Sequence, residues 1–374
     1  MTSELGRGRG PVGVAVVGCG TISNEYLRNL TSFPDVRVLF CADIDLERAK
    51  ARADEYGVPA SGSAAQALED PDVEIVVNLT IPAAHVEVAA AALAAGKNVW
   101  LEKPLALDTA AGQALLDQAG QAGLRVGCAP DTVLGAGLQT ARRVIEAGTI
   151  GAPQAALALM QNFGPESWHP DPAFLFQRGA GPLFDIGPYY LSALAGLFGP
   201  ADQVAALSRQ ARASRVIGSG PRAGTAFEVE VPTHVTALVD YAGGQAATLV
   251  LSFDSALQRS GFIEISGSEA TLALPDPNRF DGEVRVRPPG TDDWTVIPAA
   301  GASAGRGLGV LDLARALRGG GPHRASGEMA LHVLDTMEAI TGSAARHALE
   351  PVHTSFDMPA AVPADWDPLA TTLA

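Results

Sequence analysis

The first third of the chain alternates short apolar runs with alanine-rich segments of helical periodicity, and this alternation restricts its fold more than any other feature. The apolar, β-branched runs cover residues 12–17, 36–42, 75–79, 98–101 and 124–128. The helical patterns between them cover residues 22–30, 45–56, 83–95 and 108–121. Continuous apolar strands that alternate with helices indicate a parallel sheet buried on both faces. We therefore expect an α/β fold that begins with a doubly wound, Rossmann-type dinucleotide-binding domain.

The pattern changes after Pro130, where strand-like runs follow one another without helices between them. This predicts an antiparallel or mixed sheet. The expected segments are a helix at 137–147, a strand at 152–163, a Gly-, Pro- and aromatic-rich loop at 164–182, a helix at 184–198, strands at 229–239, 246–253 and 262–266, and helices at 307–317 and 328–340. The expected domains are a flexible tail at 1–10, a Rossmann domain at 11–130 and an α+β domain with an open sheet at 131–374.

Composition and charge exclude several classes of protein. Hydrophobic residues make up 47% of the chain and charged residues 18%, as in a globular protein rather than a disordered one. The net charge of −15 argues against nucleic-acid and anionic-membrane partners, which need clustered Lys and Arg. No apolar run is long enough to cross a bilayer, and the first ten residues lack the apolar core of a secretory signal.

The three cysteines, Cys19, Cys41 and Cys128, lie in apolar, strand-like surroundings. This odd-numbered set fits buried free thiols in a reducing compartment, so we expect a cytoplasmic protein. Their spacing is not that of metal ligands, and we expect no metal site.

A glycine-containing turn follows the first expected strand and opens the first helix, with the sequence Gly18-Cys19-Gly20-Thr21-Ile22-Ser23. Gly18 permits a tight turn. Gly20 lets a pyrophosphate approach the backbone beside Thr21 and Ile22, where helix N–H groups and the helix dipole favour negative charge. Ser23 replaces the third glycine of the usual fingerprint, and its small side chain is compatible with close packing. A plain turn is the alternative, but the position between strand and helix favours a dinucleotide site.

Asp43 ends the second strand, 25 residues after Gly18, where an acidic side chain can bind the ribose hydroxyls. The same carboxylate repels a 2′-phosphate, and no arginine follows it immediately. We therefore expect NAD rather than NADP as the cofactor. The alternative is that an acidic residue here only caps the next helix, a role that suits Asp45 better.

Two further strands end at the same edge of the expected sheet. Thr80 and Pro82 follow the third apolar run and are expected to line the nicotinamide side. His85 either contacts the cofactor or fixes this loop from the first turn of a helix. The fourth run ends in Glu102 and Lys103, of which Glu102 is grouped with the cofactor-binding residues. A lysine at the carboxyl end of such a strand points into the ligand crevice, where it can be held close to a reacting oxygen.

A second informative segment runs from Gly179 to Tyr190, GAGPLFDIGPYY. Within it Asp185 and Tyr189 are four residues apart, a spacing that places them on one face of a helix. A carboxylate and a phenol on one face could bind and deprotonate a substrate hydroxyl. In the structural alternative, Asp185 caps the helix and the tyrosines pack in the core.

Together these motifs resemble the Gfo/Idh/MocA oxidoreductases, which include glucose–fructose oxidoreductase and inositol dehydrogenases. The resemblance covers about residues 12–345 and depends on the motifs at 18–23, 78–85, 101–104 and 179–190 in this order. It implies a Rossmann domain followed by an α/β domain whose open sheet often forms homodimers or homotetramers. It also implies that Lys103 is catalytic and that Asp185 and residue 189 face the substrate.

Many members of the family carry His where this chain has Tyr189. A phenol has a reference pKa of about 10, so it needs a nearby cation to act near neutrality. Lys103 would supply that charge, or would exchange the proton itself if its own pKa were lowered.

Four other residues are candidates for substrate binding: Trp168, His169, Asp131 and Arg306. Trp168 and His169 suit stacking against a sugar ring, and His169 is a second candidate acid or base. Structural roles are the alternative for all four. His332 lies on an apolar helical face and is expected to be a core histidine.

The sequence thus predicts an NAD(P)-dependent oxidoreductase that transfers hydride between the nicotinamide and a hydroxyl-bearing carbon of a sugar, polyol or related compound. Three alternatives remain. They are a glycoside hydrolase that uses tightly held NAD for transient oxidation, a non-catalytic sensor of NAD and sugar, and an enzyme for an unrelated carbonyl substrate of the biliverdin or dihydrodiol kind.

Overall fold

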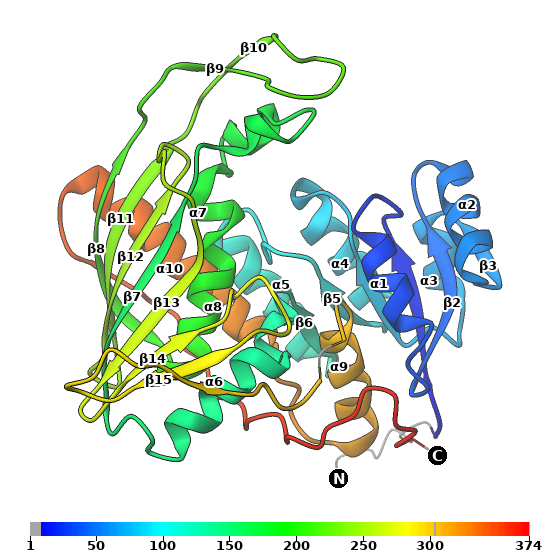
Figure 1. The fold of residues 1–374 in the computed structure, drawn as a ribbon. Helices are drawn as coiled ribbons and strands as arrows, with labels where there is room; N and C mark the ends of the chain where they lie inside the picture. Colours follow the sequence, from blue (N-terminus) through cyan, green and yellow to red (C-terminus); the bar gives the residue numbers. More distant parts are fainter. Residues whose placement is uncertain (1–8, 303, 374) are drawn as a thin grey trace. The chain divides into compact units, whose positions relative to one another are not determined.

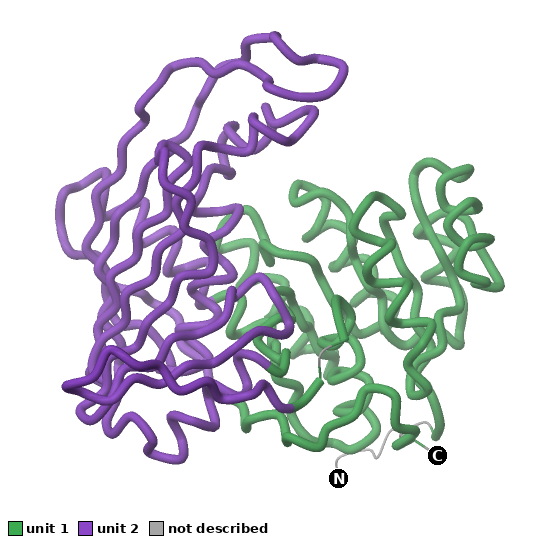
Figure 2. Tube along the Cα trace, viewed as in Figure 1, with its two compact units in different colours: residues 1–136, 301–331, 359–374 green, residues 137–300, 332–358 purple. Residues whose placement is uncertain are grey.

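The computed structural model describes residues 9–302 and 304–373. Contacts divide the chain into two compact units (Figure 2). The first contains residues 1–136, 301–331 and 359–374, and the second contains residues 137–300 and 332–358. These units do not coincide with the expected division at residue 130, because residues 301–331 and the end of the chain belong to the first one. Of the tail expected at 1–10, all but Arg9 and Gly10 lies outside the described residues.

A six-stranded parallel sheet forms the centre of the first unit (Figure 1), in the order β3-β2-β1-β4-β5-β6. This is the strand order of a doubly wound dinucleotide-binding fold, which confirms the expected fold class. The strands are β1 Val12–Val17, β2 Val36–Ala42, β3 Ala60–Gly62, β4 Ile75–Asn78, β5 Asn98–Leu101 and β6 Val126–Cys128. The helices are α1 Ser23–Leu30, α2 Leu46–Tyr56, α3 Ala64–Glu69, η1 Pro82–Ala84, α4 His85–Ala94, α5 Thr109–Ala122, η2 Asp131–Leu134 and α9 Leu308–Gly319.

The carboxyl ends of five strands finish in one row across this sheet. Val17 of β1 pairs with Ala42 of β2 on one side and with Asn78 of β4 on the other. Asn78 pairs with Leu101 of β5, which in turn pairs with Cys128 of β6. The residues that follow this row therefore emerge at one edge of the sheet, and they are Gly18, Asp43, Leu79, Glu102 and Ala129.

Local signals explain where the helices of this unit begin. Asp45 caps α2 by accepting the N–H of Arg48 at 3.1 Å, as the sequence suggested. β3 and α3 were not expected, because the strand has only three residues and the helix only six. Their signal is a capping box, in which the Ser63 and Gln66 side chains each accept a hydrogen bond from the other's backbone.

α9 packs against the parallel sheet at Trp100 of β5. The indole ring fits there because the residues that face it, Gly309 and Gly127, have no side chain. A Cβ atom at Gly309 of α9 would lie 1.9 Å from the indole ring, and one at Gly127 of β6 would lie 2.7 Å from it. Trp100 is fully buried between these backbones. The late helix expected at 307–317 therefore exists, but it covers the parallel sheet rather than the second one.

The second unit contains a nine-stranded sheet in the order β16-β15-β14-β13-β7-β12-β11-β8-β17. β7 and β12 are parallel and the other neighbours are antiparallel, so the sheet is mixed, as expected. Its strands are β7 Pro153–Gln161, β8 Ala201–Arg209, β11 His234–Tyr241, β12 Ala246–Ser252, β13 Arg259–Gly267, β14 Thr271–Leu274, β15 Val284–Arg287, β16 Thr295–Ile297 and β17 Glu350–Pro351, and β9 Ser214–Val216 pairs separately with β10 Ala226–Glu228.

Helices cover one face of this sheet (Figure 1). Tyr190 of α8 donates its hydroxyl hydrogen to the Leu159 carbonyl of β7 at 3.2 Å, and Ser343 of α10 accepts the N–H of Ala206 of β8 at 2.8 Å. The other face is open. Leu207, Leu238 and Leu157 lie on it, and the first two are 52% and 56% exposed. The helices of the unit are α6 Ala136–Glu146, which starts at the boundary, η3 Pro165–Ser167, η4 Ala173–Phe176, α7 Gly181–Asp185, α8 Gly187–Phe198 and α10 Gly327–Arg346, which runs from the first unit into the second.

Candidate functional site

The turn after β1 has the geometry that a pyrophosphate site requires. Gly18 has a φ of +97°, and a Cβ atom there would lie 2.6 Å from the carbonyl carbon of Leu79. A side chain is therefore excluded twice, by backbone conformation and by the close approach of the next strand end. Gly20 faces open space, since an added Cβ would meet no atom within 4 Å. Thr21 and Ile22 follow at the start of α1, so backbone N–H groups border this space.

Ser23 occupies the third position of the glycine fingerprint and is fully buried. Its hydroxyl donates to the Gly20 carbonyl at 2.6 Å, which ties the turn to the first residue of α1. The helix begins at Ser23, one residue later than the sequence predicted. A small residue thus both packs closely and closes the turn.

Asp43 lies beside this turn and is almost completely buried. Its carboxylate accepts the N–H of Cys19 at 2.7 Å and the N–H of Asp45 at 2.9 Å. One guanidinium nitrogen of Arg48 lies 3.7 Å from it, although no arginine follows Asp43 immediately in sequence. Asp43 therefore joins the turn after β1 to the start of α2, at the position where an acidic residue can reach a ribose.

The loop after β4 is held by two buried polar residues. The Asn78 amide donates to the His85 carbonyl at 2.9 Å, and its oxygen accepts the Thr80 hydroxyl at 2.6 Å. The two ring nitrogens of His85 lie 2.7 Å from the Pro104 carbonyl and 3.0 Å from the Thr80 carbonyl. Burial lowers the pKa of His85 against these two contacts. His85 is fully buried, so this geometry favours its role in fixing the loop, while Pro82 stays exposed.

Glu102 and Lys103 leave β5 at the same edge of the sheet, and both are half-buried. Glu102 accepts the Tyr26 hydroxyl hydrogen at 2.8 Å through one carboxylate oxygen. Its other oxygen accepts the backbone N–H of Lys103 at 3.1 Å. The backbone of the expected catalytic lysine is therefore held on one side by Glu102. On its other side, Pro104 contacts His85.

Asp131 and Arg306 are 175 residues apart, and the structure brings them together. Asp131 is fully buried at the start of α9, where it accepts the N–H groups of Gly307 at 2.8 Å and Gly309 at 3.3 Å. A guanidinium nitrogen of Arg306 lies 3.4 Å from the same carboxylate. Burial raises the pKa of Asp131, and Arg306 and the two N–H donors oppose the shift. Asp131 thus caps a helix and orients Arg306.

The segment with Asp185 and Tyr189 does not form the single helix expected at 184–198. α7 ends at Asp185 and α8 begins at Gly187, with Ile186 between them. Pro188 explains the break, because it has no N–H and its ring is tolerated only in the first turn of a helix. The four-residue spacing is therefore not a face of one regular helix. Asp185 is half-buried and Tyr189 is buried.

A buried arginine anchors the loop that precedes this segment. The Arg215 side chain is 2% exposed and forms ion pairs with Glu166 and Asp254, whose side chains are 8% and 16% exposed. It also donates to the Phe163 and Phe253 carbonyls and lies over the Phe176 ring. Arg215 therefore holds the loop expected at 164–182 at its start and at Phe176, and 3₁₀ turns order it internally.

Three aromatic rings follow one another along this loop. Trp168 meets His169 edge-on with 5.5 Å between ring centroids, and His169 meets Phe174 in the same way at 5.4 Å. Trp168 and Phe174 are both more than half exposed. Rings with free faces can stack against a sugar or a carbocycle. The sequence singled out Trp168 and His169 but not Phe174.

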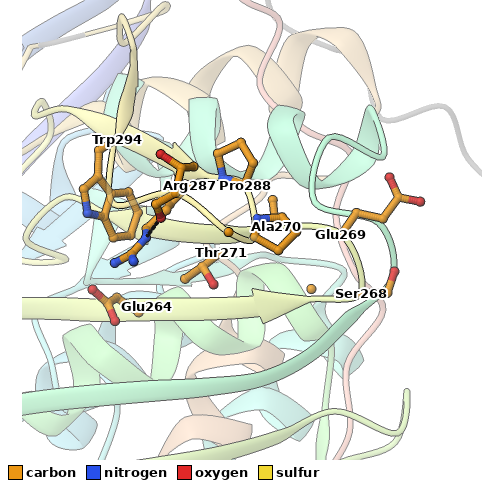
Figure 3. A pocket seen from close by; sticks show the side chains of 12 residues that line it. Glu264, Ser268, Glu269, Ala270, Thr271, Arg287, Pro288 and Trp294 are labelled. Atoms are coloured by element: carbon orange, nitrogen blue, oxygen red, sulfur yellow. Dashed lines mark hydrogen bonds between the residues drawn. The ribbon is translucent and has the colours of Figure 1, made fainter.

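A separate shallow pocket of about 390 Å³ lies at one edge of the second sheet (Figure 3). Glu264, Thr271, Arg287 and Trp294 line it, and none of the residues expected at an active site does so. Within residues 9–302 and 304–373, no three His, Cys, Asp or Glu side chains gather as metal ligands would. None of the described helices has the length and apolarity needed to cross a membrane. The three cysteines are buried free thiols, as expected.

Two parts of the chain match one protein family. Residues 12–129 match the oxidoreductase family with an NAD-binding Rossmann fold, and residues 138–273 match the Gfo/Idh/MocA C-terminal domain. The chain belongs to the Gfo/Idh/MocA oxidoreductase family. As a member of that family it is an NAD(P)-dependent oxidoreductase, and its cofactor is NAD.

Relatives agree with this membership. The chain is 28% identical over 267 residues to trans-1,2-dihydrobenzene-1,2-diol dehydrogenase from Bos taurus, which covers 70% of this chain and 73% of the relative. It is 35% identical over 147 residues to inositol 2-dehydrogenase from Ralstonia nicotianae, which covers 37% of this chain and 43% of the relative. The crystal structure of an NAD binding oxidoreductase from Klebsiella pneumoniae is 25% identical, with a TM-score of 0.80 over 92% of this chain and all of that one.

Some residues that hold the candidate segments of each unit in place were not singled out from the sequence. Asn78 could have been, since a polar residue that ends a fully apolar strand is unusual in a buried sheet. Tyr26 and Arg215 could not, because their partners lie 76 and 39–49 residues away in the chain. Only the fold brings those partners together.

Proposed function

We propose that this enzyme oxidises a secondary hydroxyl of a cyclic polyol or sugar, or reduces the corresponding ketone. The observation that carries the proposal is the row of strand ends that delivers Gly18, Asp43 and Glu102–Lys103 to one edge of the parallel sheet. The names of two relatives add to it. A trans-1,2-dihydrobenzene-1,2-diol and an inositol both carry neighbouring hydroxyls on a six-membered ring.

The first unit binds the cofactor in this proposal. The backbone at Gly18, Gly20, Thr21 and Ile22 faces the pyrophosphate, because Gly18 makes the turn and Gly20 leaves it open. Asp43 faces the ribose. Beyond these, the nicotinamide side is formed by Thr80, Pro82 and Glu102, with His85 holding the loop. When bound, the nicotinamide supplies the hydride acceptor or donor.

Lys103, Asp185 and Tyr189 are the proposed catalytic residues. Lys103 and Tyr189 exchange the hydroxyl proton of the substrate, and Asp185 orients that hydroxyl. Trp168 and His169 stack against the ring of the substrate. Arg306, oriented by Asp131, binds a further substrate oxygen.

The open face of the second sheet supports a proposal about assembly. Leu157, Leu207 and Leu238 expose an apolar patch on strands whose opposite face is covered by helices. Such a patch is typical of a surface that pairs with a second copy. We propose a homodimer or homotetramer through this sheet. The buried free thiols support a reducing, cytoplasmic location.

The test is reduction of NAD by a panel of cyclic polyols and sugars, followed at the nicotinamide absorbance. Lys103→Ala is expected to lower kcat by about 10²-fold or more, with a much smaller change in the Kd of NAD. Lys50→Ala is the matched control, because Lys50 is exposed and its ion pair with Asp54 lies on the surface of α2. Unchanged turnover in Lys103→Ala would overturn the assignment. Release of free sugar from a glycoside without net NADH would point instead to the hydrolase alternative.

A further inference from the structure

Glu102 is held at both carboxylate oxygens by groups of the protein itself. One oxygen accepts the hydroxyl hydrogen of Tyr26 at 2.8 Å, and the other accepts the backbone N–H of Lys103 at 3.1 Å. Two hydrogen bonds at opposite ends of a carboxylate fix both its position and its plane. The Glu102 carboxylate thus links Tyr26 of α1 to the backbone of Lys103, the proposed catalytic lysine.

The direction of the Tyr26 hydrogen bond is determined by a second contact. The indole N–H of Trp100 points at the Tyr26 oxygen at 3.2 Å, and an indole N–H can only donate. The Tyr26 oxygen therefore accepts from Trp100, and its single hydrogen is directed to Glu102. This gives a continuous chain of donors from Trp100 through Tyr26 to Glu102.

The two donors of this series, Tyr26 and Trp100, lie in the packed interior of the first unit. Tyr26 and Trp100 are both fully buried. Gly127 and Gly309 leave the space that the indole occupies, since a Cβ at either would overlap the ring. Burial raises the pKa of the Tyr26 phenol well above its ordinary value, and the charges of Glu102 and Asp131 add to the shift. The phenol therefore stays protonated near neutral pH and remains a donor.

We infer that Tyr26 and Trp100 are positioning residues for Lys103, and that they act through Glu102. They hold the Glu102 carboxylate so that it fixes the Lys103 backbone and places a negative charge one residue from the lysine. The inference rests on the proposed function of Lys103. It adds a relay of hydrogen bonds, from Trp100 through Tyr26 to Glu102, that determines where the Lys103 backbone is held.

Tyr26→Phe is the first test, because it removes one oxygen and leaves the ring in place. It is expected to lower kcat about 10-fold and to shift the pH profile of kcat, with less than about a threefold change in the Kd of NAD. Tyr241→Phe is the matched control. Tyr241 is a buried tyrosine of the second sheet, and its replacement is expected to leave the pH profile unchanged.

A double-mutant cycle with Glu102→Gln tests the route. If Tyr26 acts through Glu102, the double variant is expected to be no slower than Glu102→Gln alone. Additive losses of kcat would overturn the inference. So would a wild-type pH profile in Tyr26→Phe.

These outcomes are distinct from failure of the proposed function. If Lys103→Ala retains turnover, the role of Lys103 is wrong. If Lys103→Ala is inactive and Tyr26→Phe resembles the wild type, only the relay is wrong. Should Tyr26→Phe not fold, Glu102→Gln decides alone, and an unchanged kcat and pH profile in that variant would overturn the relay.

Discussion

Arg215→Met tests the buried ion cluster that holds the loop bearing Trp168 and His169. The substitution keeps an unbranched side chain of similar length but removes the charge. It leaves the carboxylates of Glu166 and Asp254 without their cation, at side-chain exposures of 8% and 16%. It also removes the donors to two carbonyl groups and the contact with the Phe176 ring.

The expected loss of stability follows from this burial. Removing one partner of a buried ion pair lowers the free energy of unfolding by about 3–5 kcal/mol, because an uncompensated charge remains. For a domain of 150–250 residues this corresponds to a fall in Tm of roughly 6–20 °C. A surface ion pair contributes only about 0–1 kcal/mol.

Arg222→Met is the matched control for this experiment. Arg222 pairs with Asp171 of the same loop, but both side chains are more than half exposed. Urea unfolding followed by circular dichroism would give the two free energies, and steady-state kinetics would give KM. Arg215→Met is expected to be less stable by several kcal/mol and to raise KM through the loop, whereas Arg222→Met stays close to the wild type. The reasoning would be refuted by equal stability of the Arg215→Met and Arg222→Met variants.

Three further predictions concern other parts of the molecule. Gly18→Ala is expected to raise the Kd of NAD at least 10-fold in a fluorescence titration. A positive φ costs an alanine about 1–2 kcal/mol, and the added Cβ meets the Leu79 backbone. The control is Gly57→Ala, which has a positive φ but open space around it and should leave the Kd unchanged. His332 accepts the Ala201 N–H at Nε2, and burial lowers its pKa. The contribution of the neutral imidazole to folding stability is therefore complete above about pH 6.5 and is lost as the pH falls through the lowered pKa. His332→Gln is expected to weaken this acid dependence in thermal unfolding between pH 7 and pH 5, and an unchanged dependence would contradict it. Leu238→Asp on the open sheet is expected to shift the protein to monomers in analytical ultracentrifugation, and a monomeric wild type would remove the basis of the assembly proposal.

Most of the parallel sheet could be predicted because five of its six strands carry their own signal. Three of the expected strands, 12–17, 36–42 and 98–101, have the bounds that the structure gives them. Each is a mainly apolar run, and burial on both faces of the sheet favours such runs in parallel strands. β3 was missed because three residues at the sheet's edge, none of them fully buried, carry no such pattern.

The break between α7 and α8 has a signal in the sequence, although a single helix was expected across it. Pro188 was visible in the sequence and cannot lie inside a helix without loss of a hydrogen bond. The apolar pattern on both sides favoured one helix from 184 to 198, and this expectation was wrong. The same proline places Tyr189 in the first turn of α8, next to the break, rather than one turn along from Asp185.

The surroundings of Lys103 lie beyond what local sequence can show, and the reason is geometric. Trp100 looks like an ordinary apolar strand residue, yet its indole fits only because residue 309, more than two hundred positions later, has no side chain. That fit brings α9 onto the parallel sheet, which is why the end of the expected second domain belongs to the first unit. It also fixes the indole N–H that orients Tyr26. A sequence motif can therefore identify the lysine, but the groups that hold it in place are determined by packing between distant segments.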